Sequence, residues 1–123
     1  MSEEINFLAI NIEESSLLNP TFRYVIYTDD NMQIALMSLL PGQDIDMEIH
    51  QGVTQFVRIE LGFGKAIIGN NEVDLSNGTA ITIPPGTSHK IVNTSRDMPM
   101  KLYTIYSPPV HDPFEIQDTE PLY

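Results

Sequence analysis

The chain of 123 residues contains no cysteine. This absence excludes disulfide bonds, thiolate ligands for a metal ion and a cysteine nucleophile. It carries no information about the cellular compartment.

Basic residues are also scarce. Six Lys and Arg stand against 17 Asp and Glu, which gives a formal net charge of −11 and an isoelectric point near 4.3. Such a charge repels phosphate backbones and anionic membrane surfaces, so we expect neither nucleic acid nor a membrane as a partner. Solvation of the protein surface accounts for most of these carboxylates.

Long apolar runs are absent as well, because no stretch approaches 18 residues. The chain begins Met1-Ser-Glu-Glu, which is acidic where a secretory signal would be basic. We therefore expect a cytoplasmic protein.

The length predicts a single domain, within which three segments can be distinguished. Residues 1–20 form an N-terminal segment with room for one short helical turn, ended by Pro20. Residues 21–110 form the β-rich body. Residues 111–123 form an acidic tail with two prolines, predicted either to be mobile or to lie as an arm over the body or a partner.

The body consists of short β-branched and aromatic runs separated by turn residues. The predicted strands are residues 22–27, 33–40, 47–50, 55–61, 65–68, 72–75, 80–83, 89–93 and 102–106. A sustained apolar stripe of helical period is lacking. Strands at intervals of about 8–12 residues predict an all-β sandwich or small barrel.

Three residues suggest a metal site. Glu48 and His50 are spaced i,i+2, so on one strand they point to the same face. A Pro-Pro-Gly turn then delivers His89 to the start of another strand. A carboxylate and two imidazoles are a workable ligand set for a divalent cation.

The turn and its histidine carry a resemblance. Gly78, Pro84, Gly86, His89 and Asn93 fill every fixed position of the second signature motif of the cupins, G-x5-P-x-G-x2-H-x3-N. The first motif, G-x5-H-x-H-x4-E-x6-G, is matched in part by Gly42, His50 and Gly62, whereas Glu48 replaces its first histidine and Gln55 its glutamate. The chain thus resembles a small single-domain cupin over about residues 21–111.

A group of small cupins, sometimes labelled mannose-6-phosphate isomerase-like, is the most similar. The run of Glu48, His50, Gln55, Phe56, Arg58 and Glu60 and the segment from Lys101 to His111 are what we expect in that group. The resemblance implies a double-stranded β-helix, that is, a jelly-roll-like barrel. The resemblance implies that Glu48 and Gln55, which replace the histidine and the glutamate of the general motif, are features of this group.

The resemblance also implies roles inside the barrel. His50 and His89 would be neutral ligands and Glu48 the anionic ligand. Gln55 would either contribute an amide oxygen to the ion or to a bound water, or be a hydrogen-bonding residue of the barrel wall. Ligand type alone does not choose among Fe(II), Mn, Zn, Ni and Cu. Asn93 is expected to satisfy backbone groups in a turn, and Lys90 to point outward.

Three other side chains are further candidates for the site, each with an alternative. Tyr24 and Tyr103 are candidates for a phenol at the cavity, with packing as the alternative. His111 is a candidate for a group that closes over the site, with a surface position as the alternative.

Three functions remain open. The first is a metal-dependent enzyme acting on a small molecule, an oxygenase or an isomerase of a sugar or oxo-acid. The second is a metal- or ligand-binding barrel without turnover, and the third is a structural dimeric barrel. Because one fold hosts many activities, the fold does not select among them. We also expect a homodimer, with residues 22–27 as a strand that pairs across the interface.

Overall fold

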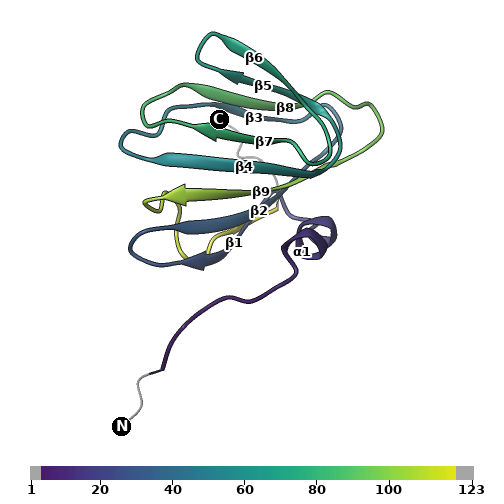
Figure 1. The fold of residues 1–123 in the computed structure, drawn as a ribbon. Helices are drawn as coiled ribbons and strands as arrows, with labels where there is room; N and C mark the ends of the chain where they lie inside the picture. The colour runs from purple at the N-terminus through teal and green to yellow at the C-terminus, as the bar shows by residue number, and fades with distance from the viewer. Residues whose placement is uncertain (1–3, 119–123) are drawn as a thin grey trace.

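The computed structural model describes residues 4–118 and consists of two antiparallel sheets that face each other (Figure 1). One sheet has the strand order β10-β1-β2-β9-β4-β7, and the other has the order β3-β8-β5-β6. The elements are α1 (Ile12–Leu18), β1 (Arg23–Thr28), β2 (Gln33–Leu39), β3 (Asp44–Glu48), β4 (Thr54–Leu61), β5 (Gly64–Ile68), β6 (Asn71–Leu75), β7 (Ala80–Ile83), β8 (His89–Asn93), β9 (Met100–Ser107) and β10 (Ile116–Gln117). The predicted all-β, jelly-roll-like architecture is confirmed.

The short helix α1 lies where the sequence predicts a helical turn. Its N-cap, Asn11, accepts a hydrogen bond from the Glu14 backbone N–H at 3.0 Å. The helix ends at Leu18, before Pro20. The Lys101 ammonium group, near the start of β9, donates to the Asn19 carbonyl at 2.7 Å and fixes this end of the helix on the sheet. Within residues 4–118 no helix is long and apolar enough to cross a membrane.

The interior changes from apolar to polar along two neighbouring strands. Facing pairs on β4 and β9 run from Ile59 and Leu102, through Val57 and Thr104, to Gln55 and Tyr106. All six residues are buried, whereas the residues between them on β4, Phe56 and Arg58, are only partly buried. The period of two residues therefore places an apolar core toward the α1 end and a polar chamber at the other end.

The C-terminal tail folds back onto the large sheet. β10 pairs with β1 at Arg23 and Tyr24, and the Val25 N–H donates to the Glu115 carbonyl at 3.0 Å. Of the two alternatives predicted for the tail, the described part up to Asp118 is the arm laid over the barrel. Because β10 covers this edge of β1, the predicted pairing of residues 22–27 with a second copy is wrong for residues 23–25.

Asn93 joins two segments of backbone at the α1 end of the barrel, the end of β2 and the connection between β8 and β9. Its amide nitrogen donates to the carbonyls of Leu39, Leu40 and Met98, and its amide oxygen accepts from the Ser95 N–H. The side chain is fully buried. The predicted structural role of this motif residue is confirmed.

We expect Asn93→Ala to lower the free energy of unfolding by about 2–4 kcal/mol, because several buried carbonyls lose their donor at once. Urea denaturation measures this change. Thr82→Ala, an exposed change on β7, is the control and should stay within about 0.5 kcal/mol of the wild type. An Asn93→Ala protein as stable as the control would contradict the role assigned to this amide.

Candidate metal centre

A β-bulge turns Glu48 into the barrel. β3 pairs with β8 through Ile45 and Ile91, but the next pair is Glu48 with His89, so β3 carries one extra residue. With regular alternation from the buried Ile45, Met47 would point inward and Glu48 outward. Instead Met47 is exposed and Glu48 is partly buried. The bulge thus shifts the phase of the strand and re-aims the carboxylate.

His50 lies in the turn after β3 and not on the strand. The prediction of a strand over residues 47–50 is wrong, because β3 ends at Glu48. The His50 carbonyl accepts a hydrogen bond from the Gly86 N–H at 3.0 Å, which ties this turn to the Pro-Pro-Gly turn. The two side chains expected to share one strand face therefore meet through a bulge and a turn.

His89 begins β8 directly after the Pro-Pro-Gly turn. The Thr87 N–H donates to the Pro84 carbonyl at 3.3 Å, and Gly86 has a φ of 74°, which suits the third position of a type II turn. The His89 ring is buried, and its Nδ1 lies 3.0 Å from the Thr87 carbonyl. Since a carbonyl can only accept, Nδ1 carries the proton and Nε2 keeps a free lone pair for a ligand bond.

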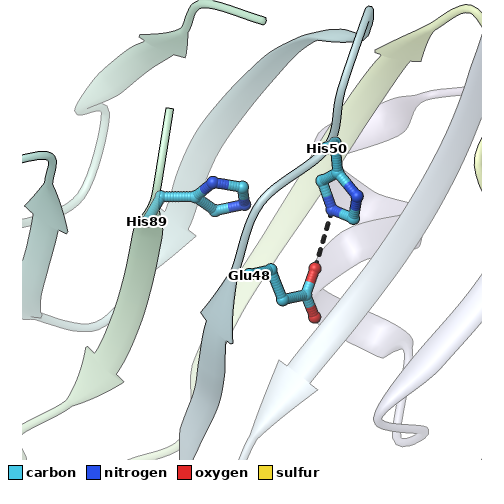
Figure 2. A group of neighbouring side chains, drawn as sticks. All are labelled: Glu48, His50 and His89. Carbon is cyan, nitrogen blue, oxygen red and sulfur yellow. Dashed lines mark ion pairs between the residues drawn. The ribbon is translucent and has the colours of Figure 1, made fainter. Parts of the chain in front are cut away.

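The three side chains converge (Figure 2). One ligand atom from each of Glu48, His50 and His89 lies within 4.8 Å of the other two. The His50 Nε2 and Glu48 Oε2 atoms are 2.7 Å apart, and the two imidazole centroids are 5.3 Å apart. Two donors about 2.1 Å from one ion are at most about 4.2 Å apart, so movements of less than about 1 Å would complete the contacts. This group could hold a metal ion.

The electrostatics keep the carboxylate ionised. Burial raises the pKa of the Glu48 carboxyl, but the contact with His50 and the charges of Arg23 and His89 outweigh it, and the net pKa is below the ordinary value. Although His50 Nε2 is so close to this carboxylate, the oxygen lies off its donating direction, and Nε2 is a buried atom without a hydrogen bond. A cation between the two groups would satisfy both.

Gln55 lies in the polar chamber, as its buried position on β4 requires. Its amide nitrogen donates to the Thr104 hydroxyl at 3.0 Å. Its amide oxygen, Oε1, is buried and has no hydrogen-bond partner. A buried carbonyl oxygen without a partner is costly, and an ion or a bound water would satisfy it.

Two further polar side chains lie near the three ligands. The sequence did not point to Tyr106, whereas it left open whether His111 closes over the site or lies at the surface, and His111 is partly buried. The Tyr106 ring packs edge-on against His50, with centroids 5.9 Å apart, and burial raises the pKa of its phenol to about 12. His111 lies against the other side of Tyr106, with Nε2 3.3 Å from the phenol oxygen. Burial, together with the charge on Arg23, lowers the pKa of His111 to about 4. Tyr106 and His111 are therefore neutral at pH 7.

Some of these residues could have been found from the pattern. Tyr106 shares the phase of Leu102 and Thr104 on the predicted strand, so alternation selects it over Tyr103, whose neighbours in phase are Lys101 and Ile105. Tyr24 is likewise outside the chamber, because it is exposed. The proposals of Tyr24 and Tyr103 as cavity phenols are wrong. Arg23 carries no such signal, because a charged residue on a strand is ordinarily expected to face water.

Hollows also lie on the outer surface of the barrel, away from the candidate centre. Two cavities of about 520 Å³ each lie between the N-terminal segment and the outer side of β1. Neither is lined by a ligand of the candidate centre. Their size alone does not make them the functional site, because titratable groups converge at the chamber and not there.

Comparison with known proteins identifies the family. The family profile described as Cupin domain matches residues 35–106, which is more than half of the chain. The chain belongs to the cupin family.

Relatives of known sequence or structure support the same assignment. The uncharacterized protein L612 of Acanthamoeba polyphaga mimivirus is 43% identical, over 98% of this chain and 78% of its own length. The uncharacterized protein YrkC of Bacillus subtilis (strain 168) is 39% identical, over 90% of this chain and 62% of its own. The crystal structure of BH2720 from Bacillus halodurans has 37% identity and a TM-score of 0.88, covering 90% of this chain and 88% of that one. These names specify no activity.

The donor set predicts a pH dependence for any bound metal. Glu48 has a lowered pKa, so its carboxylate stays ionised at pH 5 and the acid sensitivity comes from the imidazoles. An imidazole nitrogen that binds a metal ion must be free of its proton, so protons compete with the ion for both rings as the pH falls. We expect the apparent metal affinity to fall by roughly tenfold to a hundredfold per pH unit below about pH 6. Titration with Ni²⁺ or Zn²⁺ at pH 7.5 and pH 5 measures it, and equal affinities at the two values would contradict imidazole ligation.

Proposed function

We propose that this protein binds a divalent metal ion through Glu48, His50 and His89, and that the ion binds a small molecule inside the barrel. The observation that carries the proposal is the convergence of one carboxylate oxygen and two imidazoles within 4.8 Å. The hydrogen bond of His89 Nδ1 to the Thr87 carbonyl supports it, because this is the outer contact that ligating histidines ordinarily make.

The unpartnered atoms of the chamber fit such an ion. His50 Nε2 and Gln55 Oε1 are both buried without a hydrogen bond, and both are ligand atoms for divalent metals. We propose Gln55 as a fourth contact, either to the ion or to a water bound to it. In a purely structural barrel, bound water would have to satisfy both atoms, whereas one ion contacts both at once, so these atoms support the metal centre.

A bound dication would act as a Lewis acid toward an oxygen of the ligand. The one carboxylate among the three ligands leaves a net charge of about +1, which suits an anionic or enolising oxygen ligand. Oxygenase- or isomerase-type chemistry and binding without turnover use the same centre. The cytoplasmic location and the absence of nucleic-acid and membrane partners stay predictions from the sequence.

Replacement of one ligand tests the centre. In thermal melts at pH 7.5 with Mn²⁺, Fe²⁺, Ni²⁺ or Zn²⁺, we expect at least one ion to stabilise the wild type, by about 2.7 kcal/mol at a hundredfold excess over Kd. His89→Ala should lose this metal-dependent stabilisation. Lys90→Ala is the matched control, because Lys90 lies on the same strand but faces outward and pairs with Asp44 at 3.1 Å.

The comparison is made within each variant, with and without metal, so any intrinsic loss of stability cancels. Melting that is independent of metal in the wild type would overturn the proposed centre. Equal metal stabilisation in His89→Ala and the wild type would remove His89 from it.

We also propose that the chain forms a homodimer through the outer surface near β1. Large apolar side chains lie exposed there, on the N-terminal segment (Ile5 and Phe7) and on the C-terminal arm (Phe114 and Ile116). The two cavities of about 520 Å³ lie between these segments and β1. Contact through faces is compatible with β10 covering the strand edge.

Light scattering at micromolar concentration should give twice the 13.8 kDa of the chain. Phe7→Asp should shift the mass toward that of the monomer, because it places a charge in the proposed apolar contact. Leu40→Asp, at an exposed apolar residue between β2 and β3, is the control and should leave the mass unchanged. A monomeric wild type would overturn the dimer without affecting the metal centre.

A further inference from the structure

Arg23 is a buried cation inside the barrel. It points to the same face of β1 as the buried Val25, two residues further on, and it is only 6% exposed. Its guanidinium donates from NH1 to the Gln117 side-chain oxygen at 2.9 Å and lies 5.2 Å from the Phe22 ring centroid. A fully charged side chain is rarely buried unless another group balances it.

The group that balances Arg23 does so loosely. Glu115, on the C-terminal arm, has its Oε2 atom 3.6 Å from Arg23 NH1 and 3.4 Å from His111 Nδ1. Charge-assisted hydrogen bonds of this kind are ordinarily about 2.7–2.9 Å long. Both Glu115 Oε2 and Arg23 Nε are buried atoms without a hydrogen-bond partner. The guanidinium therefore keeps one buried donor, Nε, without a hydrogen-bond partner, and the carboxylate beside it is poorly held.

Arg23 belongs to the same chamber as the metal ligands. Its charge lowers the pKa of the Glu48 carboxyl, behind the larger effects of burial and His50. It also acts on Tyr106, whose ring packs against His50. No other Lys or Arg among residues 4–118 is buried; Lys65 and Lys90, for example, form partly exposed ion pairs with Glu72 and Asp44. The chamber thus has one fixed cation beside the candidate metal site.

The arm that carries Glu115 is anchored at its base. Gln33, which is fully buried, donates to the His111 carbonyl at 2.8 Å and accepts from the Val110 and His111 N–H groups. Beyond this anchor β10 contributes only two residue pairs to the sheet. The base of the arm is therefore fixed, while the carboxylate of Glu115 is held by weak contacts.

We propose that Arg23 binds the carboxylate of a small organic acid whose second oxygen donor faces the metal ion, and that Glu115 holds this place until the ligand displaces it. The inference rests on the proposed metal function and adds the class of ligand. With a dication, Arg23, Glu48 and Glu115 together, the chamber has a net charge of about +1, and displacement of Glu115 raises it to about +2. A dicarboxylate neutralises that charge, and one planar guanidinium suits one carboxylate.

Calorimetric titration of the metal-loaded full-length protein tests the inference. The probes are malonate, succinate and glutarate, with their neutral diamides and inorganic phosphate as comparisons. We expect at least one dicarboxylate to bind at least tenfold more tightly than its diamide and more tightly than phosphate. Arg23→Gln should weaken that binding at least tenfold, while the Kd for the metal changes by less than about threefold.

Glu115→Gln should change the carboxylate affinity in the opposite direction. It removes the competing charge from a partly exposed residue, so carboxylate affinity should rise about threefold to tenfold. Arg58→Gln, on the outer face of β4, is the control for loss of an arginine and should leave carboxylate affinity unchanged. If Arg23→Gln does not fold, Arg23→Lys and Glu115→Gln carry the test, with a loss and a gain of affinity expected.

The metal titration is run first on every variant, and this separates the two proposals. Two outcomes overturn the role of Arg23 and leave the metal centre standing. In the first, the wild type binds metal but no dicarboxylate. In the second, the wild type and Arg23→Gln bind the dicarboxylate with equal affinity. Unchanged affinity in Glu115→Gln overturns the displacement. A wild type that binds no metal but binds dicarboxylate through Arg23 overturns the metal centre and supports the carboxylate site.

Discussion

The alternation of side chains along each strand decides what the barrel encloses, and at the candidate metal centre a one-residue bulge in β3 shifts that alternation. Without the bulge, the phase set by Ile45 would place Met47 in the chamber and Glu48 in water. His50 and His89 would then face each other without a carboxylate between them, which is a poorer ligand set for a dication. The donor set, the lowered pKa of Glu48 and the proposed ligand chemistry all depend on this local irregularity.

The strand pattern was predictable because it depends on local composition. β-Branched runs bounded by Gly, Pro and Asn gave the strands of the body, and the Pro-Pro-Gly turn gave the position of His89. The bulge was not predictable, because no residue in Asp44–Glu48 marks the extra position. The short strand β10 was missed for a different reason, since two residues form a strand only where β1 is already in place to pair with them.

In the candidate site, too, some residues could be predicted from the sequence and others could not. Glu48, His50 and His89 could be named from their residue types and spacing, because these chemistries are uncommon together on strands. Arg23 and Glu115 meet across the whole length of the body, and only the three-dimensional structure brings them together. The interior they share is polar at one end because Gln55, Thr104 and Tyr106 replace aliphatic residues in otherwise regular strands. A barrel interior can thus combine an apolar core and a polar chamber without a separate domain for either.

The second signature motif contains residues of two kinds, those that shape the backbone and one that is a candidate metal ligand. Gly86 and Asn93 serve the backbone, one through a positive φ and the other through hydrogen bonds to two separate segments, and neither belongs to the ligand group. His89 alone among the fixed positions of that motif belongs to the group that could hold a metal ion. A barrel could therefore have another residue in place of this histidine and still keep the turn at Gly86 and the hydrogen bonds of the Asn93 amide. Recognition of the motif in a sequence is consequently stronger evidence for the architecture than for an ion inside it, and a search for metal-binding members should weigh the histidine separately from the glycine and asparagine around it.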